Sequence, residues 1–294
     1  MEFEILGKNC ISPTSSSLIL RITKERTLIF SPLPGEFIAS AILRGNEILG
    51  IKKIKKNEFR IKKVPPSHLK YKSTNSIKFP ELFSNNDIAH QTLYENTLYP
   101  LYAALGQSNT NSKFTPLSHW KICLQCVIDD IDCFGTAFIH VSHLPPSVNF
   151  CRKHATKLYT FCPSCSTPIT NHGISKFYTC QERYHQIHST LNRNESLYAE
   201  FIHELLGYRE KPFYYVCIQR LIHLKLIENT FFYNSHSIHQ AIRETIHNYF
   251  LNECEFKNTG ADTLDYQAAA AFFAYNTATS YLADIATLED LNDL

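Results

Sequence analysis

Pairs of metal-ligand residues, each separated by two other residues, dominate the middle of this chain. The pairs are Cys123 and Cys126, Cys151 and His154, and Cys162 and Cys165. Such a pair can chelate one ion from a single tight turn, and a second pair completes the tetrahedral shell that Zn²⁺ prefers. Seven of the ten cysteines fall between Cys123 and Cys180, so metal binding is expected to organise this region.

The first predicted zinc site consists of Cys123, Cys126, Cys151 and His154. The 24 residues between Cys126 and Cys151 do not prevent the site from closing, because loop entropy grows only logarithmically with length. Structural Zn²⁺ contributes on the order of 10 to 16 kcal/mol to the folding of small metal domains. We therefore expect this site to hold its segment together.

The second predicted zinc site consists of Cys162, Cys165, Cys180 and one histidine. The two-residue spacing leads from Cys180 to Arg183, which is not a zinc ligand. The nearest suitable donor is His185, which is expected to complete the site. Two histidines are alternatives, His172 and His188. The cysteines without a partner at ligand spacing are expected to be small apolar residues; they are Cys10, Cys133, Cys217 and Cys254.

Length and composition indicate a globular protein with a real core. The chain has 294 residues, of which 44% are hydrophobic and 19% charged. Its first residues are acidic where a signal peptide needs basic ones, and no apolar run approaches the roughly 20 residues of a membrane span. We expect a cytoplasmic protein without membrane contacts, in which paired cysteines bind metal rather than form disulfides.

Charge is distributed unevenly between the two ends of the chain. Between Lys52 and Lys72, Glu58 is the single acid among many basic residues, and after Lys257 there is no Lys or Arg. The basic stretch could bind a phosphate backbone or could equally be a solvated surface element. Its candidate nucleic-acid contacts are Lys52, Lys53, Lys55, Lys56, Arg60, Lys62 and Lys63.

Apolar spacing predicts a mainly α protein with small β elements. Residues 1–30 are expected to form an extension with a short hairpin, 31–118 an N-terminal helical part, 119–190 the tandem zinc-binding knuckles, and 191–294 a C-terminal helical bundle. The expected helices span residues 36–49 with Gly50 as C-cap, 86–105 with a break near Pro100, 195–206, 213–227, about 238–250 and 264–288. No internal repeat is expected.

Several motifs, taken in order, resemble the TniQ/TnsD family of transposon target-selection proteins. These motifs are Pro34-Gly-Glu36 with Ser40 and Arg44, Cys123-x-x-Cys126, Gly135, His143-Leu-Pro-Pro-Ser-Val148, Cys151-x-x-His154, Leu158 and Cys162-x-x-Cys165. The resemblance covers residues 31–190. The chain departs from the family at Pro145-Pro146-Ser147, at Ala155 where the family has glycine, and at the end of the second zinc site, where the family often has a Cys pair.

The resemblance implies a non-enzymatic adaptor that marks a DNA target and recruits the transposition machinery through an AAA+ ATPase regulator. Such an adaptor binds DNA itself or is recruited to DNA by a CRISPR effector complex. The resemblance is also compatible with a homodimer. The acidic segment from Gln267 to Leu282 weakly resembles a helix-turn-helix, but it lacks basic residues and a turn glycine, so a protein contact is favoured there.

Two other functions are compatible with the sequence. One is a zinc-dependent DNA-binding regulator unconnected with transposition, and the other is a zinc hydrolase, which requires an open metal position. We find no Gly-rich phosphate loop and no catalytic constellation in the sequence. The acids Asp129, Asp130 and Asp132 are expected to form a polar loop of the first zinc site rather than a catalytic cluster.

Overall fold

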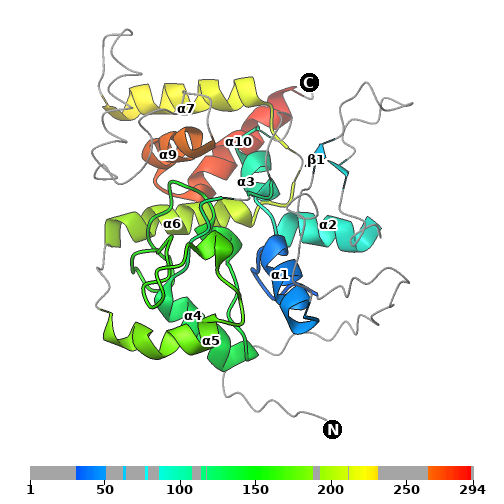
Figure 1. Cartoon of the computed structure of the whole chain (residues 1–294). Helices are drawn as coiled ribbons and strands as arrows, with labels where there is room; N and C mark the ends of the chain where they lie inside the picture. The colour runs from blue at the N-terminus through cyan, green and yellow to red at the C-terminus, as the bar shows by residue number, and fades with distance from the viewer. Residues whose placement is uncertain are drawn as a thin grey trace.

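The computed structural model describes residues 31–50, 62–63, 77–78, 86–107, 114–116, 118–187, 193–210, 212–230 and 264–292. The predicted hairpin, the predicted helix at 238–250 and most of the basic stretch lie outside these residues. The described part is mainly helical with few and short strands, which confirms the predicted fold class (Figure 1). Strand β1 (Lys62–Lys63) pairs antiparallel with β2 (Ile77–Lys78).

Helix α1 (Ile38–Ile48) buries one face and ends as predicted. Phe37, Ile38 and Ala41 are fully buried, whereas Ile48 at the end of the helix is 67% exposed. Gly50 has a φ of 69°, a left-handed conformation that glycine adopts without steric cost, and its N–H bonds the carbonyl of Glu47.

Helices α2 (Asn86–Glu95) and α3 (Tyr99–Ala104) replace the long helix expected at 86–105. The break falls just before Pro100, which stands in the first turn of α3, where its missing N–H costs nothing. Asn96 lies in the break and fixes it to the start of α1. Its amide donates to the carbonyl of Glu36 at 2.7 Å, and its own carbonyl accepts from Ile38 at 3.0 Å.

In the described part of the C-terminal half, α6 (Arg193–Leu206) and α9 (Leu264–Tyr275) pack against each other and against two further helices. In Figure 1, α7 (Tyr215–Thr230) lies at the top of the view, and α9 and α10 (Ala278–Asn292) lie between it and α6. The five alanines of α9, Ala268 to Ala271 and Ala274, are all buried, and such small side chains allow neighbouring helices to approach closely. Within the described residues, no helix is both long and apolar enough to cross a membrane.

The single helix expected at 264–288 was wrong, because the chain turns between α9 and α10. Asn276 has a φ of 58°, a conformation that asparagine tolerates better than most residues, and it takes the place of the turn glycine. The hydroxyl of Thr277 then accepts from the N–H of Ser280 at 3.3 Å at the start of α10.

One continuous hydrophobic core joins the predicted parts of the chain. It extends from Phe37 in the N-terminal part, through the cysteine-rich centre, to Ile285 in α10. Polar side chains bridge the parts as well. The Tyr281 hydroxyl donates to the carbonyl of Ala104 at 2.7 Å, and Gln107 donates to Gln267 at 2.7 Å.

Candidate metal centres and their scaffold

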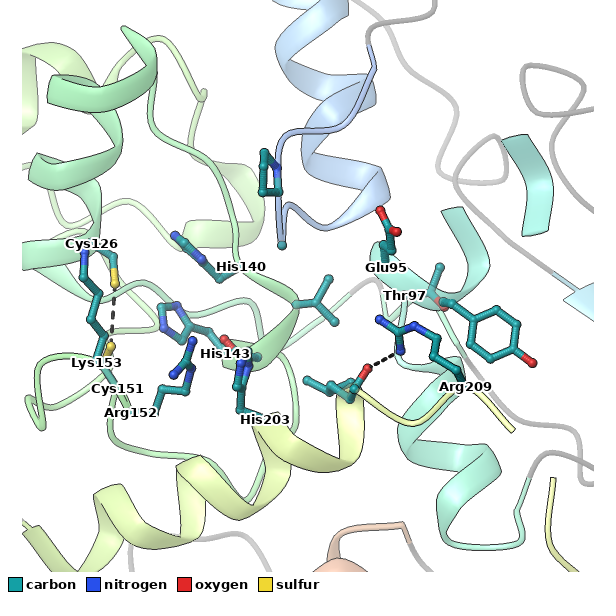
Figure 2. A pocket seen from close by; sticks show the side chains of 17 residues that line it. Glu95, Thr97, Cys126, His140, His143, Cys151, Arg152, Lys153, His203 and Arg209 are labelled. Carbon is teal, nitrogen blue, oxygen red and sulfur yellow. Dashed lines mark hydrogen bonds between the residues drawn. The ribbon is translucent and has the colours of Figure 1, made fainter. Parts of the chain in front are cut away.

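The first group of ligands comes together as predicted. Cys123 precedes α4 (Leu124–Phe134), Cys126 lies in its first turn, and Cys151 and His154 come from a tight turn. The Nδ1 atom of His154 lies 3.4 Å from the sulfurs of Cys123 and Cys126 and 3.7 Å from that of Cys151. The sulfurs of Cys126 and Cys151 are 3.6 Å apart (Figure 2).

These distances fit the edges of a tetrahedral metal site. With metal–sulfur bonds of about 2.3 Å and metal–nitrogen bonds of about 2.0 Å, such edges are about 3.8 Å between sulfurs and about 3.5 Å between sulfur and nitrogen. Four ligand atoms lie within 4.8 Å of one another, and three of the four residues are buried. The group can therefore hold one metal ion with protein ligands on all sides.

One carboxylate on α4, that of Asp129, supports the first site from outside the ligand shell. The Nε2 atom of His154 lies 3.1 Å from Asp129, which also pairs with Lys153. This contact leaves Nδ1 of His154 facing the cysteines, an arrangement common among metal-binding histidines. Burial of Asp129 acts to raise its pKa, but the hydrogen bond from Lys153 holds the pKa of Asp129 below its usual value.

The three acids at 129–132 lie on α4, so the polar loop expected for them was wrong. They also have different partners. Asp129 contacts His154, whereas Asp130 is buried and lies 2.8 Å from Nε2 of His140. Burial raises the pKa of Asp130, although His140 opposes this effect.

The second group contains His172, and the expectation of His185 was wrong. Cys162, Cys165, His172 and Cys180 place their ligand atoms within 4.8 Å of one another. The Nε2 atom of His172 is 3.6 Å from the sulfur of Cys180, and its Nδ1 donates to the carbonyl of Gly173 at 2.7 Å. His185 is exposed in the short 3-10 helix η6 (Gln181–Gln186). The alternative His188 lies outside the described residues.

Local helices explain why the fourth ligand precedes Cys180 in the chain. The 3-10 helix η5 (Ile169–Asn171) brings the chain to His172, and the short helix α5 (Phe177–Cys180) returns it to the site. The imidazole of His172 stacks on Phe177 with 4.2 Å between ring centres. Beyond Cys180, the site receives a different side chain, because the hydroxyl of Tyr184 lies 3.1 Å from the sulfur of Cys162.

The two turns that carry the ligands repeat one another, contrary to our expectation. Phe150-Cys-Arg-Lys-His-Ala-Thr156 corresponds to Phe161-Cys-Pro-Ser-Cys-Ser-Thr167, 11 residues later. In both, the N–H of the first cysteine donates to the threonine carbonyl, at 2.8 and 2.9 Å. Ala155 and Ser166, which follow the second ligand, have φ values of 53° and 57°. The same backbone therefore builds half of each site.

The pKa values of the ligand residues indicate which of them carry protons that a metal would displace. The sulfur hydrogen bonds from Cys126 and Cys151 lower the pKa of Cys123. Burial would lower the pKa of His154, but its cysteine neighbours raise it to about 10. In the second group, a contact with Thr167 lowers the pKa of Cys165 to about 6, whereas burial raises that of Cys180 to about 11. Metal binding to such a cluster displaces protons.

A buried lysine locks the segment between the two halves of the first site. Lys121 is 4% exposed, and its ammonium donates to the carbonyls of Pro145, Pro146 and Val148. Ser147, in the same segment, bonds Asp265 of α9 through its N–H at 2.9 Å. The segment from His143 to Val148 thus joins the first site to the C-terminal helices.

The Pro34-Gly-Glu36 motif forms a second buried network. The Glu36 carboxylate is fully buried and accepts hydrogen bonds from Leu33 N–H at 2.9 Å, from Ser40 at 3.1 Å and from Nη2 of Arg44 at 2.7 Å. Ser40 in turn accepts from the N–H of Ile139 at 3.0 Å. This network attaches α1 to the segment that leads into His143.

Few of the proposed DNA-contacting residues can be placed. Lys62 and Lys63 form β1, and the other five lie outside the described residues. Among the cysteines expected to be small apolar residues, Cys133 is half-buried and Cys217 is exposed, and Cys10 and Cys254 are outside the described residues. A comparison with protein-family models found no match, and neither did a comparison with curated proteins.

Proposed function

We propose that this chain is a non-enzymatic adaptor that selects a DNA target for transposition, with Zn²⁺ in both metal sites. The observation that carries the proposal is the arrangement of the motif residues behind the resemblance. The Glu36 network, the segment from His143 to Val148 and both ligand groups form one connected scaffold. A scaffold built of these particular motifs suits a member of the TniQ/TnsD family.

The ligand sets support a structural role for the metal. Three cysteines and one histidine favour Zn²⁺ over the cations that prefer oxygen ligands. In both groups four protein side chains supply the tetrahedral shell, which is the arrangement of structural rather than catalytic zinc. The scaffold can then hold surfaces for DNA and for an AAA+ regulator, either directly or beside a CRISPR effector.

The acidic C-terminal segment supports a protein contact at α10 more than at α9. Asp265 is engaged by Ser147, and α9 is buried along most of its length. We propose that α10 contacts a protein partner and that the basic stretch contacts DNA. Replacing Lys52, Lys53, Lys55 and Lys56 by Glu should weaken DNA binding and flatten its salt dependence. Unchanged binding in a salt-titrated shift assay would contradict this assignment.

A transposition assay in cells tests the proposal itself. Cells that carry the remaining transposition genes should insert the element at its target only when this chain is supplied. The variant Cys123→Ser should fail to restore insertion, whereas His185→Ala, which alters an exposed residue outside both ligand groups, should restore it. Equal insertion at the target with and without the chain would refute the adaptor role.

A further inference from the structure

A cleft of about 560 Å³ lies beside the first metal site. Its walls come from the turn before α1, the end of α2, the 3-10 helix η4 (Val141–His143), the turn after Cys151 and the end of α6. Its lining is rich in nitrogen-bearing side chains and contains one acid, Glu95. These side chains are His140, His143, Arg152, Lys153, His203 and Arg209.

The cations occupy different ends of the cleft. Figure 2 shows Arg152 and Lys153 near Cys126 and Cys151, whereas Arg209 lies at the other end near Thr97. Lys153 is paired with Asp129, and Arg152 forms a long 3.4 Å pair with Glu200 in which both side chains are substantially exposed. Exposed pairs of this kind contribute little and exchange readily for a ligand.

Arg209 is held in place without a carboxylate. Its guanidinium donates to the carbonyls of Leu206 at 2.8 Å and Tyr208 at 3.0 Å and lies over the ring of Tyr94, 5.7 Å from the ring centre. Within the described part of the chain it forms no ion pair. A fixed and unneutralised guanidinium suits recognition of an oxyanion, and its flat face suits stacking.

His143 supplies a hydrogen-bonding group without a partner in the cleft wall. Its side chain is buried, and its Nδ1 atom has no hydrogen-bond partner among the described residues. A buried polar atom left unpaired is unfavourable, so a ligand that hydrogen-bonds with it stabilises the bound state. In Figure 2 the imidazole lies between His140 and the pair of Arg152 and His203.

We propose that this cleft binds a nucleic acid strand, with phosphates on Arg152 and Arg209 and a polar group of the strand on Nδ1 of His143. A sugar–phosphate backbone alternates charged phosphates with uncharged polar groups, which matches cations at the two ends and a histidine between them. The stacked guanidinium of Arg209 also offers a flat surface to a base. The inference rests on the proposed function only for the class of ligand.

Fluorescence polarisation with a short labelled oligonucleotide, single-stranded or duplex, tests this cleft. The double variant Arg152→Gln and Arg209→Gln is compared with Lys176→Gln and Arg220→Gln, which removes the same charge at exposed positions outside the lining. Binding to the cleft variant should weaken about tenfold or more. The slope of log K against log salt should fall by about 1.4 for a single strand and about 1.8 for a duplex. The control pair should keep the wild-type slope.

Three results would overturn the cleft assignment. Equal losses of oligonucleotide affinity in the two double variants would show that binding depends only on the overall charge of the protein. Tighter cleft-dependent binding of a polyglutamate peptide than of the oligonucleotide would assign the cleft to an acidic protein partner. A wild-type chain that binds no oligonucleotide would also exclude it, yet would leave the adaptor role intact if transposition still required the chain. If transposition did not require the chain but the cleft still bound the oligonucleotide, the adaptor role would be refuted and the cleft assignment would stand.

Histidine side-chain nitrogen NMR tests the role of His143 separately. With resonances assigned through bonds, addition of unlabelled oligonucleotide should shift Nδ1 of His143, because a new hydrogen bond changes the shielding of that nitrogen. His119 is a suitable internal control, because it is exposed and does not line the cleft. A shift at His119 but not at His143 would remove His143 from the site.

Discussion

Replacing Arg44 by Met should destabilise the protein strongly, because it leaves a buried carboxylate without its cation. Glu36 is fully buried and loses two hydrogen bonds, from Nε at 3.2 Å and Nη2 at 2.7 Å of Arg44. Removing one partner of a buried ion pair costs about 3–5 kcal/mol. At about 1.4 kcal/mol per tenfold change, the unfolding equilibrium constant should rise by roughly two to three and a half orders of magnitude.

The protein carries its own probe for this measurement. Trp120 is the single tryptophan, is 4% exposed and packs edge-on against Phe37 at the start of α1, with 5.6 Å between ring centres. Urea unfolding is followed by Trp120 fluorescence at fixed metal concentration, and the midpoint and slope are compared with those of the wild type.

A second variant decides whether the buried charge is the cause. Adding Glu36→Gln to Arg44→Met removes the uncompensated carboxylate, and the amide oxygen can still accept from the N–H of Leu33. The double variant should therefore be more stable than Arg44→Met alone. A cost below about 1 kcal/mol for Arg44→Met, or a double variant less stable than the single one, would refute the reasoning.

Four further predictions concern the metal sites and their scaffold. His172→Ala should reduce bound metal from two equivalents to about one, whereas His185→Ala should retain two in metal analysis of the purified protein. Asp129→Asn should weaken metal binding at the first site about 10–100-fold in a chelator competition, and an unchanged affinity would contradict its support of His154. Ala155→Gly should stabilise the protein by about 0.5–1 kcal/mol in urea unfolding, because Ala155 has a φ of 53°; a loss would contradict this. Lys121→Met should lower the free energy of unfolding by about 1–3 kcal/mol in the same assay, since three carbonyls lose a charged donor. An unchanged free energy of unfolding would contradict the role of Lys121 in holding this segment.

Acid should release metal from both sites. Protons compete with the metal for thiolates, so metal affinity must fall as the pH falls. In the second site the Cys165 thiol has a pKa of about 6, so this ligand is largely deprotonated at pH 7 without help from a metal. The Cys180 thiol, with a pKa of about 11, must lose its proton on binding. Affinity at this site should therefore rise with pH through neutrality, and a pH-independent affinity in a chelator titration would contradict the ligand set.

Features that depend only on a few neighbouring residues could be predicted from the sequence. The spacing of Cys123 and Cys126 and of Cys151 and His154 suffices to identify the first group, because each pair sits in one turn. The end of α1 was equally predictable, since Gly50 adopts the left-handed conformation that stops a helix.

The predictions from the sequence were wrong where the path of the chain in space determines which residues meet. His185 is nearer to Cys180 in sequence, but η5 and α5 fold His172 back to the sulfurs instead. The turn at Asn276 was missed because asparagine there replaces the expected glycine. The 11-residue repeat was visible in the sequence, as Phe-Cys and Thr recur at the same offsets around Cys151 and Cys162. No pattern in the sequence predicted the cleft, because its walls come from segments far apart in the chain.

Affinity purification of the tagged, metal-loaded chain from its own cells tests the central claim most directly. The adaptor role predicts that an AAA+ ATPase and transposition components are retained with the wild-type chain and are lost with Cys123→Ser, but not with His185→Ala. Purification of the chain without any transposition component, while its two metal ions remain bound, would contradict the adaptor role.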